Sequence, residues 1–270
     1  MALKEIKILN IKINALTKTE VLNLIKNLLA DANSGQQQLV TTNPEFIMAA
    51  QEDVDFKNII NNSWLSVADG YGVRLAAKYF DLIKNNNKNK LITGLKVAWW
   101  GIMRNNKKLN IIPEVITGTD LIPEIVRIIS YESEITNKKI FLLGGFGETP
   151  CLAAKKLQQN NNLQINYSVF EAENIMEKIN SFEPLILFVA LNHPHAQKWI
   201  NANLEKMPSL KLAIGVGGAF DYLSGQIKRA PQNLQGFEWF YRLITQPRRW
   251  KRIYTAVIKF PWVVFKSNFS

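Results

Sequence analysis

Short apolar runs and helical patterns alternate along most of the chain. Residues 1–16 alternate Ile and Leu with polar side chains, which is typical of a strand. Apolar residues then recur at helical spacing from Val21 to Leu29, and Thr17 or Thr19 can cap this helix. Two short strands, each followed by a helix, are predicted next, at 38–42 and 64–70.

The alternation becomes regular in the second half of the chain. Strands are predicted at 139–143, 163–169 and 185–191, and the last of these is continuously apolar. Continuous apolar runs indicate strands covered on both faces, as in a parallel sheet. We therefore expect a Rossmann-like α/β domain at 1–225, with a mostly parallel sheet flanked by helices, and a basic helical appendage at 226–270.

Charge separates this appendage from the rest of the chain. The sequence has 270 residues, 47% of them hydrophobic, and a formal net charge of +11. Residues 226–270 hold nine Lys or Arg against one acid, Glu238, so eight of the eleven excess charges lie there. A basic segment with interleaved aromatic side chains favours an anionic surface, either membrane headgroups or nucleic acid.

Cysteine content and hydropathy bear on disulfides, export and membrane insertion. Cys151 is the only cysteine, which excludes an intrachain disulfide and a cysteine-based metal site. The first residues lack the apolar core of a signal peptide, so we expect no export. The apolar run at 253–265 is interrupted by Lys259 and Pro261 and is shorter than the ~20 residues of a membrane span. It can lie on a membrane but not cross one.

Two predicted strands end in polar side chains. Asn43 precedes Pro44 and suits a helix cap, which the preference of asparagine for caps favours. Ligands of open α/β sheets also bind at such strand ends. Asp69 precedes Gly70, and the pair is either a turn or a site at which a carboxylate accepts a proton from an attacking hydroxyl.

Glycines cluster after two other strands, at 144–147 and 215–218. Neither cluster has the G-x-G-x-x-G spacing, and no ribose-binding acid follows, so we reject a nicotinamide dinucleotide site. Glycine lets the backbone approach a ligand, and a nucleotide can still rest on these turns.

The segments GGAFDYLSG, KRAP and FEWFYRL..QPRR, in that order, resemble the WecG/TagA/CpsF glycosyltransferases, which build bacterial cell-surface polymers. The resemblance implies inverting, metal-independent transfer of a hexose or N-acetylhexosamine. The donor would be a UDP-sugar, without another cofactor, and the acceptor a polyprenyl-diphosphate-linked sugar. The enzyme would act at the cytoplasmic face of the membrane, in polysaccharide or teichoic-acid-type biosynthesis.

The resemblance also assigns site residues. It makes Asp69 the general base and places the segment TTNPEF, with Thr41 and Asn43, in the active-site pocket. Without a metal, arginines and backbone N–H groups must stabilise the leaving diphosphate. We expect the UDP-sugar to bind at Gly144, Gly145, Gly217, Gly218, Asp221, Arg229, Arg242 and Arg248.

The chain departs from the family in two places. Residues 81–112 are expected to form an insertion relative to the family. Its Asn/Lys tracts indicate solvated loop, and its Trp99 and Trp100 suit a core, a membrane or a partner equally. The family pattern Gly-x-Pro-Lys-Gln-Glu, aligned on Pro194, has Ala196 where the glutamine is expected. Gln197 can supply an amide only from about 100° further round a helix.

Two other interpretations remain open. The Ala196 departure allows a catalytically impaired family member that binds lipid carrier or partner enzymes. A nucleic-acid-binding module is the third possibility, although no nucleic-acid fold signature supports it and we expect no such partner. We expect neither His193 nor His195 to bind metal, because no third ligand of suitable spacing is near. The tail is expected to dock the protein on the inner face of the plasma membrane, and a homo-oligomer is possible.

Overall fold

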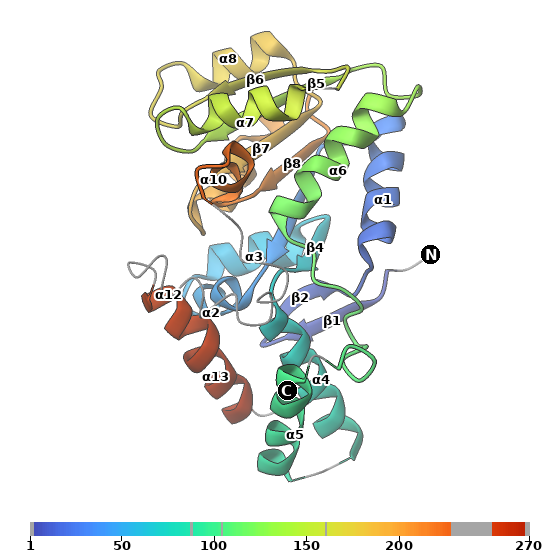
Figure 1. Ribbon diagram of the computed structural model, residues 1–270, viewed down its shortest axis with the longest axis vertical. Coiled ribbons are helices and arrows are strands. Elements are labelled where there is room, and N and C mark those ends of the chain that lie inside the picture. Colours follow the sequence, from blue (N-terminus) through green and yellow to red (C-terminus); the bar gives the residue numbers. More distant parts are fainter. Residues whose placement is uncertain (1–2, 87–88, 104, 160, 228–249, 268–270) are drawn as a thin grey trace.

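The computed structural model describes residues 3–86, 89–103, 105–159, 161–227 and 250–267. One eight-stranded sheet, ordered β1-β2-β4-β3-β8-β7-β5-β6, runs through the molecule (Figure 1). The strands are β1 (Glu5–Ile8), β2 (Ile11–Asn14), β3 (Gln37–Thr42), β4 (Leu65–Ala68), β5 (Lys139–Gly144), β6 (Gln164–Ser168), β7 (Ile186–Ala190) and β8 (Leu212–Gly215). All neighbours are parallel except β1 and β2, which confirms the predicted mostly parallel α/β sheet.

The N-terminal segment differs from the single strand predicted for it. Leu9 and Asn10 have φ angles of 50° and 62°, so the chain reverses there and β1 pairs antiparallel with β2. A two-residue turn with both φ values positive matches the twist of a hairpin. Asparagine tolerates this conformation, but leucine rarely adopts it, which is why the alternation alone did not reveal the turn.

Helices cover both faces of the sheet. On one face lie α1 (Lys18–Ala30), α6 (Gly118–Tyr131), α7 (Thr149–Gln158) and α10 (Ala219–Ser224). On the other lie α2 (Pro44–Glu52), α3 (Val54–Asn62), α8 (Ile175–Phe182) and α9 (His195–Asn203), which leads into the 3₁₀ turn Leu204–Lys206. Consecutive residues of β3 enter opposite cores, Leu39 with α1 and α6 and Val40 with α2 and α3, as the alternation of a strand requires.

Thr17, rather than Thr19, begins α1. Its hydroxyl oxygen accepts the backbone N–H of Glu20, and the Glu20 carboxylate accepts the backbone N–H of Thr17 in return. This reciprocal capping box requires an acid three residues after the cap, and only Thr17 has one.

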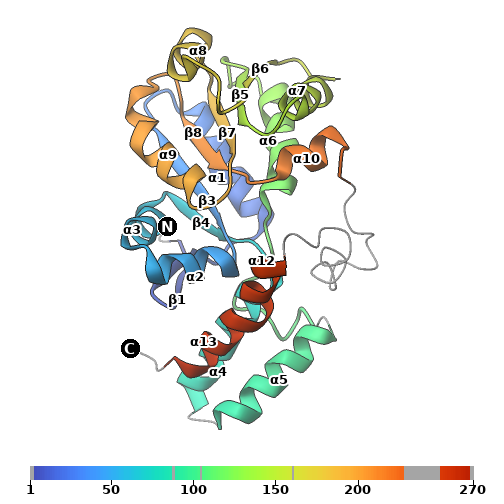
Figure 2. The same cartoon turned by 90° about the vertical axis from the view of Figure 1, so that its left-hand side faces the viewer.

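Three helices form one end of the molecule, α4 (Tyr71–Asn86), α5 (Lys90–Ile102) and the tail helix (Figures 1 and 2). The tail helix is continuous over Trp250–Lys266 and comprises α12 (Trp250–Tyr254), a π-helical stretch (Thr255–Lys259) and α13 (Phe260–Lys266). No helix in the described part of the chain is long and apolar enough to cross a bilayer.

The structure partly corrects the loops predicted at 81–112. The amphipathic pattern of α4 continues through Asn86, and Asn89 caps α5 by accepting the backbone N–H groups of Leu91 and Ile92. Asparagine is a weak helix former but a strong cap, so one Asn-rich tract both ends and begins a helix. The second tract, around Asn105, forms turns as predicted.

Candidate active site

The carboxyl ends of the parallel strands meet at one edge of the sheet. β3 lies between β4 and β8, and the helices that follow β3 and β8 pass to opposite faces, α2 to one and α10 to the other. Open α/β sheets bind ligands at such a divergence. The polar strand ends identified from the sequence converge on this edge.

Asn43 and Asp69 lie side by side there. Thr42 pairs with Ala68 across β3 and β4, and the backbone N–H of Asp69 donates to the carbonyl of Thr42 at 2.8 Å. Both side chains are half-buried. The backbone thus places residues 43 and 69 side by side at a partly solvated edge, where a carboxylate can accept a proton from a bound hydroxyl.

Asn43 is also the helix cap that its sequence context predicts. Its side-chain oxygen accepts the backbone N–H of Phe46 at 2.9 Å, at the start of α2. The cap uses the amide oxygen, whereas the amide NH₂ is a separate donor group. Capping and ligand binding by Asn43 are therefore compatible. Thr41, by contrast, pairs with Val67 within the sheet and is only 4% exposed, so it lies beneath the edge.

The two glycine turns border α10 but differ in their surroundings. Gly144 has a φ of +96°, and a Cβ there would lie 2.7 Å from the carbonyl oxygen of Ala190, so close packing of β5 on β7 requires glycine. Gly145 lies against Phe220 of α10. Gly217 has a φ of +53° with open space where its Cβ would be, which leaves room for a ligand to approach the backbone.

Asp221 lies over the second turn. A Cβ on Gly218 would be 3.3 Å from an Asp221 carboxylate oxygen. The structure therefore brings Gly217, Gly218 and Asp221 together. Arg229, Arg242 and Arg248 lie outside the described residues, so their assignment to the diphosphate stays a prediction.

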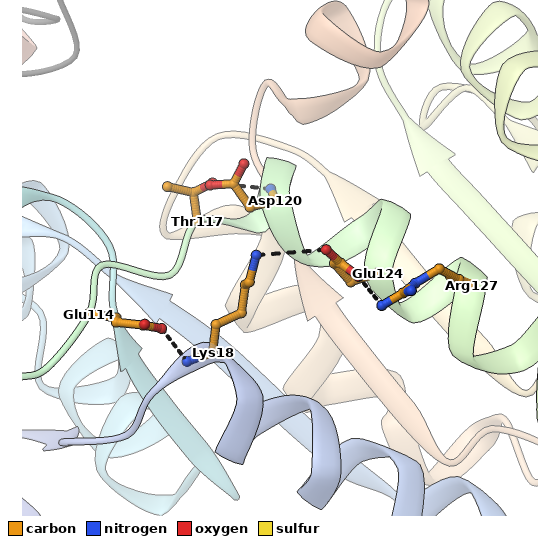
Figure 3. Close-up of polar contacts among 6 residues, drawn as sticks. All are labelled: Lys18, Glu114, Thr117, Asp120, Glu124 and Arg127. Carbon is orange, nitrogen blue, oxygen red and sulfur yellow. Dashed lines mark hydrogen bonds and ion pairs between the residues drawn. The ribbon is translucent and has the colours of Figure 1, made fainter. Parts of the chain in front are cut away.

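The start of α6 also borders this edge. Ile116 donates its backbone N–H to Ala68 at the end of β4, and a Cβ on Gly118 would meet Val216 at 3.3 Å. Thr117 caps α6 by accepting the backbone N–H of Asp120 and donates its hydroxyl to the Asp120 carboxylate at 2.7 Å (Figure 3). The segment at 116–120 was not among the site residues expected from the sequence, although Thr117 caps a helix as Asn43 does.

Lys18 connects the start of α1 to α6 and to the segment that precedes α6. Its backbone N–H donates to Glu114 at 2.6 Å and its ammonium group lies 3.7 Å from Glu124, which also pairs with Arg127 (Figure 3). A hollow of about 330 Å³ opens beside these residues. It is lined by Lys18, Thr119, Asp120, Pro123, Glu124, Tyr222 and Leu223. Two acids and one base do not favour a diphosphate there.

Gln197 does not replace the family glutamine at an exposed position. It is 1% exposed and its amide nitrogen lies against Gly215, beside Ala196. Its side-chain oxygen has no hydrogen-bond partner among the described residues. The departure in this motif thus leaves a buried amide beneath the end of β8.

The loop after β7 carries His193, which faces α2 and the tail helix. Its ring lies 4.9 Å from the ring of Phe46, and its Nδ1 is 3.9 Å from a carboxylate oxygen of Glu45. Arg252 of the tail helix donates to that same oxygen at 2.5 Å. Burial lowers the pKa of His193 more than Glu45 raises it, and Arg252 lowers it further. His193 is therefore neutral near pH 7.

Ion pairs hold the tail helix against α2. Besides Arg252 with Glu45, Lys259 lies 3.2 Å from Glu52. A hollow of about 240 Å³ lies between α2 and the tail helix, beside these ion pairs. It is lined by Glu45, Met48, Ala49, Glu52, His193, Lys251, Arg252, Thr255 and Lys259. Phe260 of the same helix is 1% exposed and packs over Gly72, near the start of α4 and three residues after Asp69.

Among the described residues, no group of three or more His, Cys, Asp or Glu side chains is arranged to hold a metal ion. His195 begins α9 and His193 lies in the preceding loop.

Comparison with known proteins shows which protein family the chain resembles. The family model described as "Glycosyl transferase WecG/TagA/CpsF family" matches residues 6–99 and 82–270. The two matched segments overlap within the stretch predicted to be an insertion.

Two relatives carry the same name, N-acetylglucosaminyldiphosphoundecaprenol N-acetyl-beta-D-mannosaminyltransferase. The protein of Bacillus subtilis (strain 168) is 32% identical over 231 residues, which cover 84% of this chain and 78% of the relative. That of Staphylococcus aureus (strain MRSA252) is 27% identical over 256 residues, covering 92% of this chain and 87% of the relative.

Proposed function

The chain belongs to the WecG/TagA/CpsF family of glycosyl transferases, and on this premise we propose that it transfers an N-acetylhexosamine from a UDP-sugar to a polyprenyl-diphosphate-linked sugar. The observation that carries the proposal is the pair Asn43 and Asp69 at the carboxyl edge of β3 and β4. The names of the relatives make N-acetylmannosamine the first candidate sugar and a diphosphopolyprenol-linked N-acetylglucosamine the first candidate acceptor.

Asp69 acts as the general base. Its carboxylate accepts the proton of the acceptor hydroxyl while that oxygen attacks the anomeric carbon of the donor. The new glycosidic bond forms as the bond between the anomeric carbon and the diphosphate oxygen breaks, and UDP leaves with that electron pair. Attack opposite the leaving group inverts the anomeric centre. Asn43 orients the acceptor through its amide.

The leaving diphosphate needs positive charge. We assign this to Arg229, Arg242 and Arg248, whose planar guanidinium groups bind phosphate oxygens in pairs. Replacing each by alanine should reduce transfer by ~10² or more, the scale for one stabilising donor. Arg127→Ala is the matched control, because Arg127 is exposed on α6 and pairs with Glu124. Equal activity of all four variants would place the leaving-group contacts elsewhere.

The reaction is proposed to need no metal. Dialysis against a chelator should leave the transfer rate unchanged, and recovery with Mn²⁺ or Mg²⁺ after a loss would contradict the proposal.

A catalytically impaired family member is the second candidate. Ala196 and Gln197 favour it, because Ala196 has no amide group and the amide of Gln197 is buried. Mass spectrometry of UDP-sugars incubated with a polyprenyl-diphosphate-GlcNAc acceptor separates the two. A glycosylated lipid product supports the enzyme, whereas acceptor binding without product from any UDP-sugar supports the impaired member.

The site of action is proposed to be the inner face of the plasma membrane, with the protein bound peripherally through its tail. Deleting everything after Ser224 tests this poorly, because Phe260 and Val264 are buried in the body's core and their loss exposes apolar surface. Point variants in the full chain are the sharper test.

A further inference from the structure

Helix α5 has an apolar face that the described residues leave uncovered. Six large apolar side chains on it are each 59–65% exposed. They are Leu91, Ile92, Leu95, Trp99, Ile102 and Met103. At 100° per residue these positions fall within an arc of about 120°, so they form one continuous stripe. This stripe is the outer face of α5.

The opposite side of α5 is packed. Thr93 and Val97 are buried, and a Cβ on Gly101 would lie 2.9 Å from Leu75 of α4. A Cβ on Gly94 would meet Phe265 of the tail helix at 3.8 Å. The helix is therefore fixed on α4 and α13 with its outer face turned away from them (Figure 2).

The segment that contains this helix is basic, and the nearest acid before it, Asp81 of α4, pairs with Lys78 at 2.9 Å. Residues 82–113 contain seven Lys or Arg and no Asp or Glu. Of the 33 Lys and Arg residues in the chain, seven lie here and nine lie at 226–270. The rest of the chain has 17 Lys and Arg and 21 Asp and Glu. The chain thus has two basic segments on a slightly acidic body. Lys96 lies next to the stripe, and both it and Lys108 lie over the ring of Trp100, at 5.1 and 5.2 Å from its centroid.

The tail helix presents a second exposed stripe at the same end. Trp250, Tyr254, Ile258 and Trp262 follow one another at intervals of four residues and are each 52–56% exposed. Trp262 stacks on Phe265, the residue that contacts Gly94 of α5, and Lys266 lies over its ring. Both basic segments therefore carry exposed aromatic and aliphatic side chains, and they touch.

We propose that the outer face of α5 is a membrane-docking surface that lies in the headgroup region of an anionic bilayer, alongside the tail helix. An exposed apolar stripe flanked by lysines, without acids, has the composition of an interfacial helix. Tryptophan suits the headgroup depth, and the lysines suit anionic lipid. With 13 residues α5 is about 20 Å long and lies along the bilayer rather than across it.

This proposal deepens the proposed function, because it rests in part on an acceptor held in a membrane. α4 links the two regions: it begins two residues after Asp69 and runs 16 residues, about 24 Å, to the segment that precedes α5. Gly101, near the end of α5, packs on Leu75, near the start of α4, so the two helices are antiparallel and a bilayer along the outer face of α5 lies within one helix length of the general base. A lipid-linked sugar can span such a distance while its polyprenyl chain stays in the membrane.

Vesicle sedimentation with the full chain tests the surface. On phosphatidylglycerol/phosphatidylcholine vesicles, Leu95→Gln combined with Trp99→Gln should weaken binding about tenfold or more, since interfacial binding scales with apolar area. A second pair, Ile92→Gln with Ile102→Gln, removes other residues of the stripe and should act alike. Tyr131→Gln is the control, because Tyr131 is 74% exposed on α6. It should bind as the unmodified chain does.

Lipid charge and oligomeric state complete this test. Binding of the unmodified chain should be about tenfold weaker on phosphatidylcholine alone. Unchanged vesicle binding of both α5 pairs would overturn the proposal. The proposal would also be overturned if the unmodified chain is a dimer and both pairs of substitutions convert it to a monomer without changing vesicle binding. The outer face of α5 would then be a contact between two copies of the chain.

A transfer assay separates this proposal from the proposed reaction. With a water-soluble, short-chain acceptor the α5 pairs should transfer sugar as the unmodified chain does, and with the acceptor in vesicles they should lose most activity. Absence of transfer by the unmodified chain would refute the reaction and leave the vesicle result standing. Equal loss with both acceptors would show that α5 affects the active site itself and would overturn the docking role.

Discussion

Replacing Gly144 by alanine should destabilise the fold, and replacing Gly217 should not do so to the same degree. An alanine at 144 would take a φ of +96° and place its Cβ 2.7 Å from the carbonyl oxygen of Ala190. That oxygen also accepts the backbone N–H of Gly145 at 3.2 Å, so moving it costs a hydrogen bond. Backbone strain of ~1–3 kcal/mol and a lost bond of ~1 kcal/mol give a total of ~2–4 kcal/mol.

Gly217 is the matched control. Its φ of +53° lies in the left-handed region, and nothing lies within 4 Å of the position of its Cβ, so alanine costs only the ~1 kcal/mol of that conformation. Urea unfolding measures both variants, and a lower midpoint with an unchanged slope identifies a stability change. We expect Gly144→Ala also to melt ~5–10 °C lower. Equal stability of the two variants would refute the packing role of Gly144.

The same pair of variants should differ in activity in the opposite sense. A methyl group on Gly217 would stand in the open space beside Gly218 and Asp221 and should raise the KM for the UDP-sugar. The methyl group of Gly144→Ala would meet Ala190 rather than open space, so the expected contact of this turn with the UDP-sugar through its backbone should remain and the KM should be retained at temperatures at which the variant stays folded. A normal KM for Gly217→Ala would remove this turn from the donor site.

Three further results are expected. In a double-mutant cycle of Arg252→Ala and Glu45→Ala followed by urea unfolding, the half-buried ion pair should show a coupling of ~1 kcal/mol, and zero coupling would refute its anchoring role. Because burial lowers the pKa of His193, the unfolded chain binds its proton more readily, so stability should fall as pH drops below ~6.5. His193→Gln should flatten that pH dependence, and an unchanged slope would contradict it. Phe260→Ala, in the core, should cost ~3 kcal/mol while Trp262→Ala, exposed on the same helix, costs under ~0.5 kcal/mol. Similar losses would show that the tail helix is not docked.

Sequence periodicity was sufficient to predict the fold class, but it could not predict which strands are neighbours in the sheet. β5 and β7 were predicted within one residue at each end because their interiors are continuous apolar runs. The hairpin at Leu9 and Asn10 was missed because no glycine marks it, and α5 because its Asn/Lys flanks are typical of loops.

The candidate site was predicted in part. Asn43 and Asp69 were singled out because each follows a strand and precedes a helix, and the family resemblance assigned them to the site, but their adjacency depends on the sheet order, with β4 between β2 and β3. The same holds for the contact of Gly118 with Val216, which joins segments almost a hundred residues apart. His193 with Glu45 and Arg252 was missed, since only the docked tail helix brings them together.

The rate of glycosyl transfer by Asp69→Asn tests the central claim most directly. Asparagine keeps the shape of the side chain and removes the base, so the fold should persist while turnover of UDP-sugar and lipid-linked acceptor falls by ~10² or more. Asp55→Asn, exposed on α3, is the control and should stay within about twofold of the unmodified chain. An Asp69→Asn enzyme that forms the lipid-linked product at the rate of the control would contradict the assignment of the general base and of the carboxyl edge of β4 as the site of the reaction.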